Sequence, residues 1–118
     1  MKINKNNNSI VALFDKDEIT IKNVNDVLDI MANVSSMNSY KIVIYKESLN
    51  ESFFDLKTKL AGEILQKLVN YNMKIAIIGN FEEYNSKSLH DFIFESNNGK
   101  QIFFKSTLEE GLISLHSS

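Results

Sequence analysis

The sequence predicts a single α/β domain with a mixed, mostly parallel five-stranded sheet flanked by about four helices, in the order ββαβαβαβα. The clearest support is the helical pattern of residues 51–71, which leads directly into the apolar run 73–79. Short β-branched strands also alternate with segments whose apolar residues recur at helical spacing. Strands that alternate with helices favour parallel neighbours joined by right-handed crossovers.

The first half of the chain is predicted to form a hairpin, a helix and a strand. The polar residues 1–8 are expected to be flexible, and a tight turn at Lys16 and Asp17 is expected to close the hairpin. Asparagines precede the helical pattern and suit a helix start. In order, the expected elements are strands at 9–15 and 18–21, a helix from Asn23 or Asn25 to about Ser36, and a strand at 40–45.

The second half is predicted to alternate helices and strands. The long helix at 51–71 starts from a capping box at Ser48 and Glu51 or from Asn50, and its interior Gly62 suggests close helix packing. The remaining elements are a strand at 73–79, a helix from Ser86 to Asn98-Gly99, a strand at 101–105, and a helix opened by the capping box 106–109, with residues 117–118 frayed.

Composition narrows the class of protein. At 118 residues the chain fits one domain, 1–118, and its net charge is −2. Every basic residue is a lysine, so the chain lacks the arginine guanidinium groups that form paired hydrogen bonds with phosphates and guanine edges. No nucleic-acid partner is therefore expected. Without cysteine there is no disulfide or thiolate site, and neither a metal nor a cofactor is expected. No signal or membrane segment is recognised, which favours a cytoplasmic location.

The expected binding edge lies where the parallel strands end. Open parallel sheets place ligands outside the carboxyl ends of their strands, and the start of a helix offers backbone N–H groups to an anion. The alternative for Ser86 is that it only caps its helix. The candidate residues for a small ligand at this edge are Tyr45, Lys46, Asn80, Ser86, Lys87 and Ser88.

A small enzyme is the competing interpretation of the same edge. It would use Lys87 or Lys46 together with Asp15, Tyr45 or Glu82 around a pocket. Neither histidine has a partner at metal-ligand spacing, and no Gly-rich phosphate loop or HExxH pattern occurs.

The apolar stripe of the long helical segment is wide enough to be buried on two sides. This predicts self-association, with Phe53, Phe54 and Leu65 as interface candidates and a further protein partner as an option. The alternative is that these side chains simply cover the sheet.

The run FFDLKTKLAGEILQKLVNYNMKIAIIGNF, followed by SKSLHDFIFESN and IFF, resembles a bacterial family catalogued as domain-of-unknown-function family 4180. More distantly, the early DLK, the KIAIIGN strand end and the late Phe103, Glu109, Glu110 and Leu115 are similar to the SpoIIAA-like branch of the STAS fold. The first resemblance implies a small cytoplasmic α/β domain. The second implies a non-enzymatic regulator that acts through partner contact or a small ligand, although the serine switch segment of that class does not follow residues 40–45.

Overall fold

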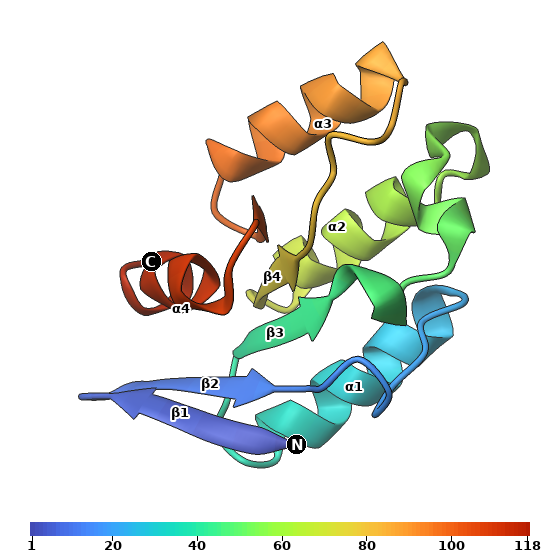
Figure 1. The fold of residues 1–118 in the computed structure, drawn as a ribbon. Helices are drawn as coiled ribbons and strands as arrows, with labels where there is room; N and C mark the ends of the chain where they lie inside the picture. The colour runs from blue at the N-terminus through green and yellow to red at the C-terminus, as the bar shows by residue number, and fades with distance from the viewer.

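Five strands form one mixed sheet whose order follows the chain, β1-β2-β3-β4-β5 (Figure 1). The structure is a computed structural model that describes residues 1–118. β1 runs antiparallel to β2, and β2, β3, β4 and β5 pair in parallel with their neighbours. The strands are β1 (Lys2–Asn6), β2 (Ser9–Leu13), β3 (Lys41–Tyr45), β4 (Lys74–Ile78) and β5 (Ile102–Lys105).

The central pairing of the prediction is confirmed. β3 and β4 are parallel neighbours, in register from Lys41 opposite Lys74 to Tyr45 opposite Ile78. Both strands are buried along most of their length because helices cover both of their faces, as their nearly continuous apolar sequences indicated.

Three helices cover one face of the sheet and the fourth covers the other. Right-handed crossovers between strands that follow one another in space place every connecting helix on the same face. The helices are α1 (Val24–Ser35), α2 (Leu60–Asn70), α3 (Lys87–Asn97) and α4 (Leu108–His116). The core under α1, α2 and α3 holds 21 buried residues, and the core under α4 holds 6. The hydrophobic core is therefore larger on the face of the sheet covered by α1, α2 and α3 than on the face covered by α4.

The predicted hairpin was wrong in position. The strands of the hairpin are β1 and β2, so residues expected to be flexible form a strand, and the turn falls at Asn7, which adopts a φ of 56°. The segment 18–21 is not a strand, and only Ile21 forms an isolated bridge, with Leu49. β1 escaped notice because an edge strand with both faces largely exposed carries no apolar alternation.

The predicted long helix was wrong over its first part. Three short 3-10 helices precede α2: η1 (Lys46–Ser48), η2 (Glu51–Phe54) and η3 (Leu56–Thr58). Lys59 separates η3 from α2 and adopts the left-handed conformation, with a φ of 66°. Asn50 caps η2 and Asp55 caps η3, each through its side-chain oxygen. Hydrogen bonds from nearby backbone N–H groups to the side chains of Asn50 and Asp55 therefore stabilise short turns in place of one continuous helix.

Gly62 lies in the first turn of α2 and has open space around it. A Cβ added there meets no atom within 4 Å, so the predicted close helix packing at this glycine was wrong. By contrast, a Cβ at Gly79 would lie 2.6 Å from the Cβ of Lys46, and this close approach requires glycine.

The remaining helix starts agree with the sequence to within a residue. Asn23 caps α1 and Ser86 caps α3. The cap of α4 is Thr107, one residue later than the predicted box, and its oxygen accepts from the N–H of Glu110. None of these helices combines the length and apolar character needed to cross a membrane.

Candidate functional site

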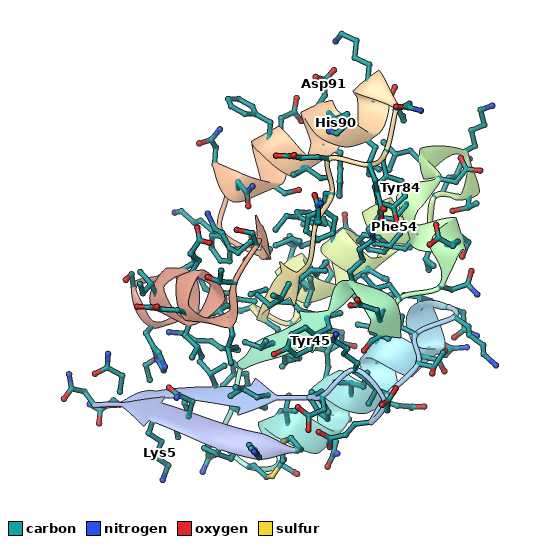
Figure 2. The ribbon with its side chains drawn as sticks, in the orientation of Figure 1. Lys5, Tyr45, Phe54, Tyr84, His90 and Asp91 are labelled. Carbon is teal, nitrogen blue, oxygen red and sulfur yellow. The ribbon has the colours of Figure 1, made fainter.

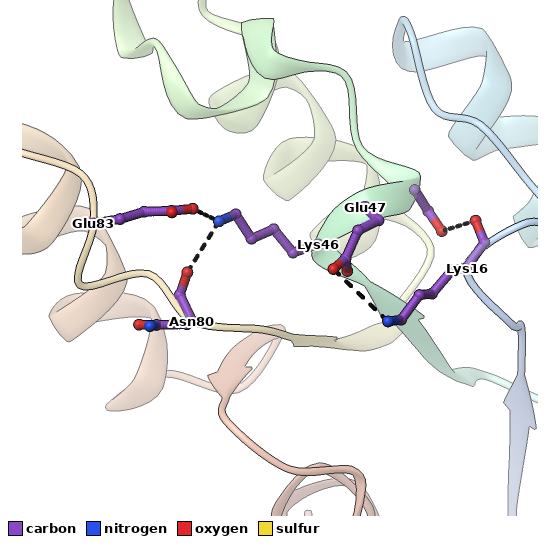
Figure 3. Close-up of polar contacts among 6 residues, drawn as sticks. Lys16, Lys46, Glu47, Asn80 and Glu83 are labelled. Carbon is purple, nitrogen blue, oxygen red and sulfur yellow. Dashed lines mark hydrogen bonds and ion pairs between the residues drawn. The ribbon is translucent and has the colours of Figure 1, made fainter.

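At the carboxyl edge of the sheet, Lys46 is held by partners within the domain. Its ammonium forms an ion pair with Glu83 and donates to the carbonyl of Asn80 at 3.1 Å (Figure 3). The same ammonium lies 4.9 Å from the ring centroid of Tyr84. These contacts tie the end of β3 to the loop before α3. Lys46 therefore acts as a clamp and is not available to a ligand in this conformation.

The other predicted binding residues at this edge also have local roles. Ser86 Oγ accepts from the N–H of Leu89, and Lys87 pairs with Asp91 at 2.8 Å, which raises the pKa of Lys87. Ser88 is exposed, and Tyr45 is half-buried against the core under α4. The structure thus brings Lys46 and Asn80 together, while Ser86 caps α3 and Lys87 and Ser88 lie in its first turn.

The strand order explains why this edge lacks a crevice. Ligand crevices in open α/β sheets form where neighbouring crossovers diverge to opposite faces. Here β2 to β5 follow in sequence, so their crossovers never diverge. What remains is an open depression of about 630 Å³ between the ends of β4 and β5, walled partly by Phe81, Phe104 and Glu110.

The predicted interface residues lie mostly in the interior. Phe53 is fully buried and Phe54 is 5% exposed, and their rings meet edge to face at 5.0 Å. Phe54 also stacks on Tyr84 at 4.9 Å (Figure 2). Burial, followed by the nearby Glu51 carboxylate, raises the pKa of Tyr84 to about 12. Leu65 is half-buried on α2.

An apolar pocket lies at the opposite, amino edge of the strands, between α1 and the segment that links the end of α2 to β4. It has a volume of about 460 Å³. Tyr40 and Tyr71 stand at this edge with 50% and 60% of their surfaces exposed. The full lining is Leu28, Met31, Ala32, Ser35, Tyr40, Tyr71 and Met73.

Matching turns create this pocket. The turns after α1 and α2 each place an asparagine in the left-handed region, Asn38 with a φ of 60° and Asn72 with a φ of 53°. In each turn the N–H of the residue after the asparagine donates to a carbonyl oxygen of the preceding helix. Ser39 donates to Val34 at 3.0 Å, and Met73 donates to Leu68 at 2.8 Å. This is the Schellman pattern of helix ends, and it leads both helices into their strands at one edge.

No charged side chain lines this pocket. An ion inside it would lose its hydration without gaining a partner of opposite charge, which is unfavourable. The walls therefore suit a small uncharged apolar molecule, with the tyrosine rings available for stacking. No group of three or more His, Cys, Asp or Glu side chains comes together in a way that could hold a metal ion.

Residues 6–115 match the family described as Domain of unknown function (DUF4180). The chain belongs to this family. A search of curated proteins finds no match.

The DUF4180 domain also contains a polar cluster that sequence reasoning missed. His116 Nδ1 lies 2.7 Å from Ser9 Oγ, and His116 Nε2 lies 2.7 Å from Asn4 Oδ1. Lys41 Nζ lies 2.9 Å from the same Ser9 oxygen. These residues come from α4, β1, β2 and β3, and their separation along the chain left no local signal.

Proposed function

We propose that this DUF4180 domain is a regulatory binding module of STAS-like build whose ligand is a small uncharged apolar molecule. The observation that carries the proposal is the pocket between α1 and α2, with its apolar lining and its volume of about 460 Å³. The sequential strand order and the helices on both faces support the STAS-like build.

The contrast between the two edges of the sheet supports this choice of site. At the carboxyl edge, Lys46, Ser86 and Lys87 are engaged by partners within the domain. At the amino edge, Tyr40 and Tyr71 have half or more of their surfaces open to solvent. An aromatic molecule in the pocket would remove apolar surface from water without displacing an existing ion pair.

Binding at this place gives a physical route to regulation. The pocket is walled by α1 and by Tyr71, the residue that ends α2, so an occupant would contact both and restrict the relative movement of the two helices. Regulation then acts through the outer surface of α1 and α2, where a partner or a second copy would sense the change. Self-association and a cytoplasmic location complete the proposal.

A fluorescence titration tests the ligand class directly. The chain has no tryptophan, so the emission of indole added to the protein is not obscured by an indole of the protein itself. We expect the anisotropy of indole to rise with protein concentration, and expect the anion indole-3-acetate and the cation tryptamine to bind more weakly. Equal or stronger binding of either charged probe would contradict an uncharged ligand.

A pair of variants on α1 locates the binding. Ala32→Phe places a ring in the pocket and should abolish the indole signal, whereas Asn33→Phe adds the same ring at an exposed neighbour that does not line the pocket. Loss of binding only in Ala32→Phe supports the site. Similar binding by both variants would refute it.

A further inference from the structure

The polar cluster around Ser9 forms a directed chain of hydrogen bonds. Lys41 can only donate, so it donates to Ser9 Oγ at 2.9 Å. Asn4 Oδ1 can only accept, so His116 donates to it through Nε2–H at 2.7 Å. In neutral His116 the remaining nitrogen, Nδ1, is then an acceptor, and the Ser9 hydroxyl donates to it at 2.7 Å. The order is Lys41 to Ser9 to His116 to Asn4.

This arrangement contains the parts of an activated serine. A hydroxyl lies within hydrogen-bond distance of an imidazole nitrogen, and a third group fixes the opposite nitrogen of the ring. Lys41 adds an ammonium beside the hydroxyl oxygen. Its position suits it to stabilise negative charge that develops on a carbonyl oxygen during attack by Ser9.

The electrostatic environment keeps the imidazole in its basic form near neutral pH. Burial, and then the positive charge of Lys41, lowers the pKa of His116 from its ordinary value of 6.5. Burial, and then the neighbouring Lys74, lowers the pKa of Lys41. Lys41 also donates to the main-chain oxygen of Ser118 at 3.2 Å, which holds its ammonium in place.

A groove beside α4 reaches this cluster at His116. It has a volume of about 410 Å³ and places Leu108, Leu112 and Ile113 of α4 beside His116. Asn6, which also lines the groove, is the residue directly opposite Ser9 in the pairing of β1 with β2. An apolar chain lying against the α4 leucines would thus have its reactive end beside His116, whose Nδ1 lies 2.7 Å from Ser9 Oγ.

We propose that Ser9 is a nucleophile that accepts the acyl group of carboxylic esters with an apolar acyl chain. The bond formed joins Ser9 Oγ to the carbonyl carbon, and the bond broken joins that carbon to the oxygen of the leaving alcohol. His116 Nδ1 takes the Ser9 proton and returns it to the leaving oxygen. Water then attacks the acyl-serine with His116 as base, releasing the carboxylic acid and regenerating Ser9. This activity is independent of the ligand pocket between α1 and α2.

Labelling with a fluorophosphonate tests the nucleophile in the unmodified protein. The tryptic peptide covering 6–16 contains Ser9 as its sole hydroxyl residue, and the peptide covering 88–100 carries exposed Ser88 as an internal reference. We expect mass spectrometry to find the adduct on peptide 6–16 and not on peptide 88–100. No adduct on 6–16, or equal labelling of both peptides, would overturn the proposal.

Variants and pH test the role of His116. Removal of the base in His116→Gln should lower the labelling rate by about 100-fold, in line with general-base contributions. Asn4→Asp supplies the stronger carboxylate partner and should raise the rate. In the unmodified protein the rate should fall with decreasing pH as His116 is protonated, with its midpoint below 6.5. A rate unchanged in His116→Gln, or independent of pH in the unmodified protein, would overturn the role of the imidazole.

Discussion

Gly62→Ala is predicted to stabilise the protein. Gly62 lies within α2, its φ is not positive, and a Cβ placed there meets nothing within 4 Å. The alanine therefore adds no clash and removes conformational freedom from the unfolded chain. The expected gain is roughly 0.5–1 kcal/mol in the free energy of unfolding.

The thermal shift follows from the size of the domain. With an unfolding entropy of about 2.1 cal/mol/K per residue, 118 residues give a total of about 0.25 kcal/mol/K. The predicted gain then corresponds to a rise in Tm of about 2 to 4 °C. Differential scanning calorimetry of the variant and the parent protein measures this rise directly.

Gly111→Ala is the matched control, because Gly111 also lies within a helix but faces the sheet. A Cβ there would lie 2.7 Å from Ile78 Cδ1 and 3.3 Å from Ala76 Cβ. Overpacking of this kind costs about 1–3 kcal/mol and should outweigh the helix propensity gained. A lower Tm for Gly62→Ala, or an equal rise for both variants, would refute the placement of α2 and α4.

Three further predictions concern the backbone, the core and pH. Lys59→Gly should raise the free energy of unfolding by about 1 kcal/mol, because Lys59 has a φ of 66°, which glycine adopts without strain. Denaturant unfolding measures this change, and a lower stability of the variant would contradict the prediction. Phe53→Ala should lower it by about 3–5 kcal/mol, because Phe53 is fully buried, and a loss under about 1 kcal/mol would refute that burial. The folded state lowers the pKa of His116 below 6.5, so the unfolded state binds more protons as the pH falls through 6.5 and the free energy of unfolding should decrease. In His116→Gln this decrease, measured from urea midpoints, should be smaller. An unchanged pH dependence in that variant would contradict the prediction.

The fold was largely predictable because periodicity reports burial. The runs that became β3 and β4 are apolar on both faces, and α1 and α3 carry Asn23 and Ser86 at their starts. β1 was missed because its residues are polar and mostly exposed, so no core face marked it. The break at Lys59 was missed because the apolar stripe continues past it and nothing in the identity of a lysine signals a positive φ.

The candidate sites were less predictable because both depend on long-range placement. Asn72 was expected only to help end the long helix and Asn38 had no expected role, yet the left-handed turns at these two residues bring Tyr40 and Tyr71 to one edge. An asparagine just before a strand is the signal that could have indicated those turns. The contact between Ser9 and His116 spans 107 residues and depends on the face that α4 covers. The spacing patterns that identify helices and strands do not detect a contact between residues so far apart in the sequence.

Binding of a small apolar molecule in the pocket between α1 and the end of α2 can be observed by NMR of protein labelled with ¹³C at the methionine methyls. The chain has four methionines; Met31 and Met73 line the pocket, while Met1 lies in an exposed position before β1. On titration with indole, we predict that the Met31 and Met73 methyl resonances shift together and saturate while Met1 stays in place. Equal shifts at all four methyls, or shifts that exclude Met31 and Met73, would contradict binding in this pocket.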